Sequence, residues 1–154
     1  MTKKKKSRGR RDAVRVQSGA LRAARLSAIK SDILNNLRQH TLSIHGMASR
    51  HGVSTRYIRQ LFAADGTSFA DFVLDQRLAA VHLRLSDIRF ADRTISVIVF
   101  EVGFGDVFEF SRAFQRRYGV TPSDVREAAR LKSANRPTPL QANSANERGC
   151  DGLN

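Results

Sequence analysis

The sequence is poor in the residues that crosslink chains or anchor them in membranes. It contains a single cysteine, Cys150, and no tryptophan, so a disulfide within the chain is excluded and a reducing, cytoplasmic environment is expected. No apolar run is long enough to cross a bilayer, so no membrane partner is expected. The basic N-terminus MTKKKKSRGRR lacks a following apolar segment and does not resemble a secretory signal.

The sequence patterns of catalytic chemistry are also missing. We find no nucleophile elbow, no glycine-rich phosphate loop and no acid pair suited to a pocket. The histidines His40, His45 and His51 lie five and six residues apart, a spacing that does not align them on one helical face. The sequence therefore predicts a protein that is not an enzyme, with no catalytic residue, metal site, cofactor or evident site for a small-molecule effector.

The positive charge of the chain is concentrated at its N-terminus. The formal net charge is +13, yet residues 1–11 alone carry seven Lys or Arg and no acid, whereas residues 41–131 carry twelve basic and ten acidic residues. We expect a basic disordered arm over 1–17, a folded domain over 18–131 and a disordered polar tail over 132–154. Charge alone leaves two roles open for the arm, a solvated chain end or a contact for a polyanion.

Two segments of the chain resemble each other at a fixed offset. IHGMASRHGV, residues 44–53, and ISVIVFEVGF, residues 95–104, match at apolar and glycine positions that lie 51 residues apart. The second segment alone favours a strand because it is rich in β-branched residues. The first has helical apolar spacing and a glycine suited to end a helix. The repeat therefore predicts two helices, the second tolerating its β-branched residues because that face is buried.

Each of these helices leads through a short turn into another helix. Ser54 and Asp106 are suited to cap the second helices, and Glu109 suggests a capping box with Asp106. The pattern predicts two helix-turn-helix units, over 44–65 and 95–118.

A long helix over 68–85 is expected to join the two units, because apolar residues lie on two of its faces. One face contains Phe69, Phe72, Val73, Ala80 and Leu83, and the other contains Leu74, Leu78, Val81 and Leu85. A first helix over about 18–39 covers the first unit, and a short last helix begins at Thr121-Pro122 and ends near Arg130. The predicted fold class is all-α, with about seven helices and two helix-turn-helix subdomains joined by the connector helix.

The outward faces of the second helices carry residues suited to DNA. Arg56 and Gln60 lie opposite the apolar face in the first unit, with Arg59 on the flank, and Arg and Gln near a helix N-terminus suit guanine and adenine edges. In the second unit the outward residues are Phe108, Arg112 and Gln115, flanked by Val107, Ser111 and Arg116. For Val107 we favour packing over contact with a thymine methyl group, and both roles stay open for Phe108.

Together these motifs resemble the DNA-binding domain of the AraC/XylS transcription regulators. The resemblance rests on GVSTRYIRQLF, SFADFVLDQRL and GFGDVFEFSRAFQRRYGVTPSDVR, and it runs from about residue 42 to residue 126. It implies a seven-helix monomer that places its two units in adjacent major-groove segments of double-stranded DNA. With the flanking Arg116 added, the DNA-binding candidates are Arg56, Arg59, Gln60, Val107, Phe108, Ser111 and Arg112.

The resemblance further implies a sequence-specific transcription regulator of the bacterial cytoplasm, associated with the nucleoid, and suggests an activator that contacts RNA polymerase. One alternative is a non-specific nucleic-acid binder that uses the basic arm, because phosphate contacts supply affinity without sequence information. Another is a module of a longer effector-sensing regulator, since most family members carry a further domain before this one. The operator, the direction of regulation and dimerisation stay open.

Overall fold

The computed structural model describes the backbone of residues 5–135 and the side chains of residues 17–135. Within that range the chain forms seven α-helices, one short 3-10 helix and no strand, which confirms the predicted fold class. The elements are α1 (Lys5–Asn35), α2 (Ile44–His51), α3 (Thr55–Ala64), α4 (Phe69–Leu85), η1 (Ile88–Phe90), α5 (Ile95–Val102), α6 (Val107–Tyr118) and α7 (Pro122–Ala134).

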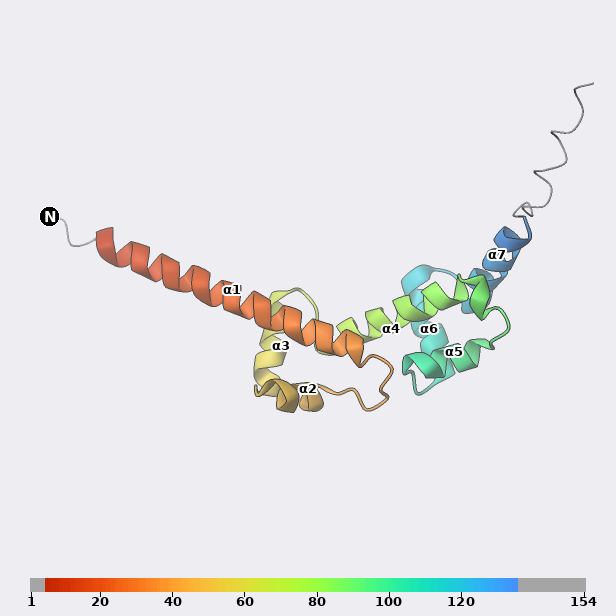
Figure 1. Cartoon of the computed structure of the whole chain (residues 1–154), viewed down its shortest axis with the longest axis horizontal. Helices are drawn as coiled ribbons and strands as arrows, with labels where there is room; N and C mark the ends of the chain where they lie inside the picture. The colour runs from red at the N-terminus through yellow and green to blue at the C-terminus, as the bar shows by residue number, and fades with distance from the viewer. Residues whose placement is uncertain (1–4, 136–154) are drawn as a thin grey trace, which may run out of the picture.

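The helices form two lobes joined by α4, so that the molecule is elongated (Figure 1). The first lobe contains α2 and α3 beneath the C-terminal half of α1, and the second contains α5, α6 and α7. The two helix-turn-helix units predicted over 44–65 and 95–118 are therefore confirmed as α2–α3 and α5–α6.

Each lobe has its own hydrophobic core. The first core consists of Ile29, Ile33, Met47, Ala48, Ile58, Leu61, Phe62 and Val73. The second core consists of Leu78, Val81, Leu85, Ile98, Val99, Val102, Phe104, Phe110, Ala113 and Phe114. Helix α4 is the element that contributes buried side chains to both, because its N-terminal half reaches one lobe and its C-terminal half the other.

For a residue of α4, its position along the helix therefore decides which core it contacts more than the helix face on which it lies. Phe69, Phe72 and Val73 pack on the first core as expected. Ala80, on the same predicted face, packs against the second core, and Leu83 is 71% exposed. A helix of 17 residues is about 26 Å long, so residues on one face meet different lobes at its two ends.

The predicted caps and turns account for where the helices of the two units begin and end. Ser54 and Asp106 accept hydrogen bonds from the third residues of α3 and α6, at 3.1 and 2.8 Å. Gly52 and Gly103 end α2 and α5 with φ of +62° and +108°, a conformation that glycine adopts without steric cost. The reciprocal bond of a capping box, expected from Glu109 to Asp106, is found at the start of α7 instead.

The first helix differs most from its prediction. It was expected over about 18–39, preceded by a disordered arm over 1–17, but α1 begins at Lys5 and ends at Asn35. The structure has helix from residue 5 onward, and Arg, Lys, Ala and Gln are good helix formers whatever their net charge. Residues 1–4 lie outside the described residues.

The last helix runs further than the predicted end near Arg130, to Ala134. The remainder of the predicted polar tail, residues 136–154, lies outside the described residues. Among the helices that the structure describes, none is both long and apolar enough to cross a membrane.

Candidate nucleic-acid interface

Helix α3 is held in the first lobe by one face and presents the other to solvent. Ile58, Leu61 and Phe62 are buried in the first core. The three predicted site residues, Arg56, Arg59 and Gln60, are all exposed. Gln60 also lines a groove of about 580 Å³ between α1 and α3, together with Arg22 and Tyr57, so the exposed face of α3 continues onto α1.

Helix α6 is arranged in the same way in the second lobe. Its buried face is formed by Phe110, Ala113 and Phe114, which belong to the second core. The predicted site residues Phe108, Arg112 and Arg116 are exposed on the other side.

The remaining two candidates on α6 are less exposed and make contacts within the protein. Val107 is half-buried and packs against the second core, in agreement with the role favoured for it. The Ser111 hydroxyl donates a hydrogen bond to the backbone carbonyl of Val107 at 2.9 Å. Both side chains therefore have partners within the protein.

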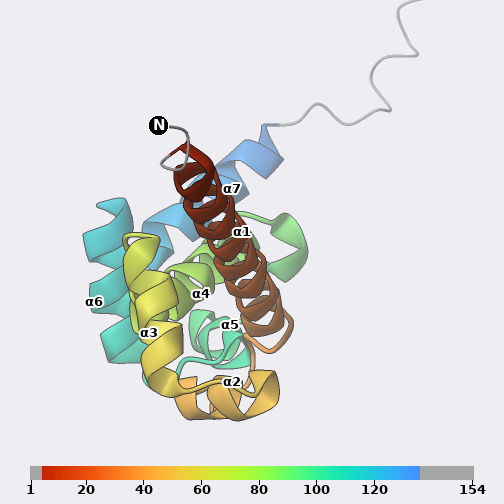
Figure 2. The same cartoon turned by 90° about the vertical axis from the view of Figure 1, so that its left-hand side faces the viewer.

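The two helices with exposed faces lie in different lobes. In the end-on view of Figure 2, both α3 and α6 appear to the left of α1. Figure 1 shows that they are separated along the long axis, with α4 running from one lobe to the other. The structure thus brings the predicted residues into two groups, one on α3 in the first lobe and one on α6 in the second.

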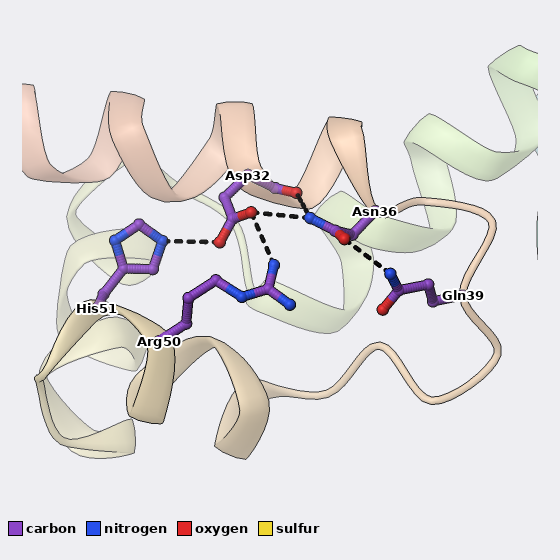
Figure 3. Close-up of polar contacts among 5 residues, drawn as sticks. All are labelled: Asp32, Asn36, Gln39, Arg50 and His51. Atoms are coloured by element: carbon purple, nitrogen blue, oxygen red, sulfur yellow. Dashed lines mark hydrogen bonds and ion pairs between the residues drawn. The ribbon is translucent and has the colours of Figure 1, made fainter.

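A polar network on α1 fixes the end of α2 (Figure 3). The Asp32 carboxylate accepts hydrogen bonds from Arg50 Nη1 at 2.8 Å and from the Asn36 side chain at 2.8 Å, and His51 Nε2 lies 3.0 Å from its other oxygen. Since α3 begins four residues after His51, this network positions the start of the exposed helix.

His51, one of the three histidines whose spacing does not suggest a metal site, has the Asp32 carboxylate as its partner. Within residues 17–135 no cluster of three His, Cys, Asp or Glu side chains is arranged to hold a metal ion.

A second polar contact joins the connector helix α4 to the segment after α1. Arg77 of α4 donates hydrogen bonds to the backbone carbonyls of Leu37 and Gln39, in the segment after α1, at 3.2 and 2.9 Å. Burial lowers the pKa of the Arg77 guanidinium from its ordinary value, so these carbonyl bonds replace part of its lost hydration. Gly103 lies beside them, since a Cβ added there would be 2.7 Å from the Leu37 oxygen and 3.0 Å from Arg77 Nη2.

Sequence reasoning missed both polar contacts. Helical periodicity identifies residues that share a face, but Arg77 bonds to carbonyl oxygens, which every residue possesses, across about forty residues of chain. Asp32 and Arg50 are eighteen residues apart, and nothing in the local sequence pattern distinguishes them from other charged residues.

The cleft between the lobes, about 580 Å³, is lined by Arg77, Arg112 and Arg116.

A family model described as "Helix-turn-helix domain" matches residues 47–128. This span runs from within α2 into α7 and contains the second unit and all but the first three residues of the first.

Curated relatives are transcription regulators. The transcriptional activator RhrA of Rhizobium meliloti (strain 1021) is 38% identical over 106 residues, which are 68% of this chain and 33% of RhrA. The regulatory protein SoxS of Escherichia coli (strain K12) is 33% identical over 88 residues, which are 55% of this chain and 78% of SoxS. The chain thus spans about a third of the length of RhrA but most of SoxS.

Solved structures share the arrangement of helices. The DNA-binding domain of AdpA, a global transcriptional factor whose crystal structure contains a target DNA, has a TM-score of 0.61 with this chain at 20% identity. The match covers 72% of this chain and 97% of the AdpA domain. At that identity the likeness shows the fold.

Proposed function

The chain belongs to the AraC/XylS family of helix-turn-helix transcription regulators, and on this premise we propose that α3 and α6 read bases in adjacent major-groove segments of one DNA site. The base-reading residues in this proposal are Arg56, Arg59 and Gln60 on α3, and Phe108 and Arg112 on α6. Arg116 approaches a phosphate or base at the edge of the second contact, and Val107 and Ser111 support the helix end that enters the groove.

The observation that carries the proposal is the equivalent placement of two exposed helix faces. Each is the second helix of its unit, each has its apolar face buried in its own core, and each presents its opposite face to solvent. A recognition helix in a major groove needs this arrangement, because only side chains at its exposed face reach base edges. Arginine on both faces suits guanine and phosphate contacts.

The activity of the whole regulator is part of the proposal, because the match covers only a third of RhrA. We propose an activator that contacts RNA polymerase, acts in the bacterial cytoplasm and performs no catalysis itself.

Selection of bound sequences from a random duplex pool, at near-physiological salt, tests the proposal. The full chain is compared with a version that lacks residues 1–11. We expect both to enrich one asymmetric motif with two blocks about one helical turn apart. If nothing is enriched and binding disappears with residues 1–11, the protein is a non-specific binder held by its basic N-terminus.

Single substitutions then test the named residues. Arg56→Ala and Arg112→Ala are each expected to cost roughly 1–3 kcal/mol on the selected site and to relax preference at one position of the corresponding block. Arg89→Ala is the matched control, because Arg89 of η1 is exposed and pairs with Asp87, and η1 packs against α4 and α7. Equal losses on all sequences would make the two arginines phosphate contacts rather than base readers.

A further inference from the structure

Phe108 is the most exposed aromatic side chain among the described residues, with 71% of its surface accessible. Single exposed apolar residues are common on protein surfaces, so exposure alone gives it no role. Its position is more informative. Phe108 is the second residue of α6 and lies on the helix face opposite Phe110 and Phe114, which are fully buried.

The internal repeat relates Phe108 to a residue that is proposed to read bases. Arg56 is the second residue of α3, as Phe108 is of α6, and the two helices follow equivalent capped turns. The same correspondence relates Gln60 to Arg112. The two units therefore present the same positions with different chemistry, which is polar in the first unit and partly apolar in the second.

Arg112 is placed directly beside the Phe108 ring. Its guanidinium carbon lies 5.9 Å from the ring centroid, within the range of a cation–π contact. The pair combines a flat apolar surface with a planar fork of donors. In the major groove the methyl group of thymine is the apolar feature, and guanine offers the two acceptors that suit an arginine fork.

Resting on the proposed function, we propose that Phe108 makes the second unit recognise a thymine through its C5-methyl group. The thymine lies within two base pairs of the base that Arg112 contacts. Four residues of helix span about 6 Å, which is less than two base-pair steps of about 3.4 Å. Because Arg112 is already held against the ring, its side chain loses less conformational entropy when it contacts its own base. The two contacts therefore support each other.

Replacement of thymine by deoxyuridine tests this proposal, because it removes the methyl group and leaves every hydrogen-bonding group in place. Each thymine in the α6 block of the selected site is replaced in turn, and the dissociation constant is measured for the full chain. We expect one replacement to weaken binding roughly fourfold, the factor that corresponds to one buried methyl-sized group. With Phe108→Ala the same replacement should have no effect.

Phe100→Ala is the matched control, since Phe100 is also an exposed aromatic residue, at 44%, but belongs to α5. That variant should keep the full effect of the replacement. Equal affinity of the native chain for thymine and deoxyuridine at every position would overturn the inference while leaving sequence-specific binding intact. So would a Phe108→Ala loss that is the same on both DNAs, which would indicate stacking or wedging between bases. Absence of any selected motif would instead contradict the proposed function.

Discussion

Gly52 and Gly103 occupy equivalent places in the two units but differ in what surrounds them. Both adopt a left-handed conformation at the end of the first helix, a role that the repeat in the sequence predicts. A Cβ at Gly52 would meet no atom within 4 Å, whereas at Gly103 it would collide with the Leu37 carbonyl and Arg77. Only the second glycine therefore also allows the lobes to approach each other.

Alanine at each position separates these two roles. Gly52→Ala should lower the free energy of unfolding by about 1–2 kcal/mol, the cost of a left-handed conformation for a residue with a Cβ. Gly103→Ala should cost about 2–4 kcal/mol, because steric overlap is added to that strain. Denaturant unfolding of both variants checks the difference, and equal losses would show that the junction between the lobes yields without cost.

Helix α5 shows why the helices could be predicted from the sequence better than the contacts between them. Ile95–Val102 contains β-branched residues that favour a strand, yet it is a helix because Ile98, Val99 and Val102 fill the second core. The repeat revealed this, as it revealed the caps and the exposed faces of α3 and α6. The start of α1 could not be found in that way, because the residues before its buried segment have no apolar period to mark a boundary.

The attachment of α2 to α1 depends on Asp32, whose side chain is largely buried. Asp32→Ala leaves Arg50, His51 and Asn36 without their shared acceptor, and we expect a loss of roughly 1–3 kcal/mol in unfolding free energy. Asp65→Ala, which removes a more exposed pair with Lys30, should cost less than about 1 kcal/mol. Chemical denaturation at low and high salt measures both. A loss for Asp32→Ala as small as the control would mean that apolar packing alone holds α2.

Arg77 holds α4 to the segment after α1 through the carbonyls of Leu37 and Gln39, beside Gly103 at the end of α5. The relative orientation of α3 and α6 therefore depends on α4 and on this contact together. On the proposed DNA site, an insertion of one base pair between the two blocks rotates the second by about 35°. We expect the native chain to lose at least about tenfold in affinity on such DNA, as one misplaced bidentate contact would cause.

Arg77→Ala should weaken binding to the parent site and reduce the additional penalty of the insertion, because the lobes can then reorient. Arg77→Lys is expected to give an intermediate result, since an ammonium group lacks the planar fork that bonds two carbonyls at once. Binding measured on parent and inserted sites provides the comparison. An unchanged insertion penalty in Arg77→Ala would show that α4 alone fixes the orientation.

Because α4 contributes to both cores, it acts as a rigid spacer that fixes the distance between α3 and α6. On the proposed DNA site, once one of the two helices has bound its block, the other helix meets its own block at a high effective concentration. That concentration is high at one spacing between the blocks and falls steeply at others, since a helix does not stretch as a flexible linker does. Two contacts that are weak by themselves then give a high overall affinity only where the blocks have the matching separation. On the proposed function, such a protein selects DNA by the distance between the two blocks as well as by their base sequences, and it dissociates quickly from sites where either is wrong.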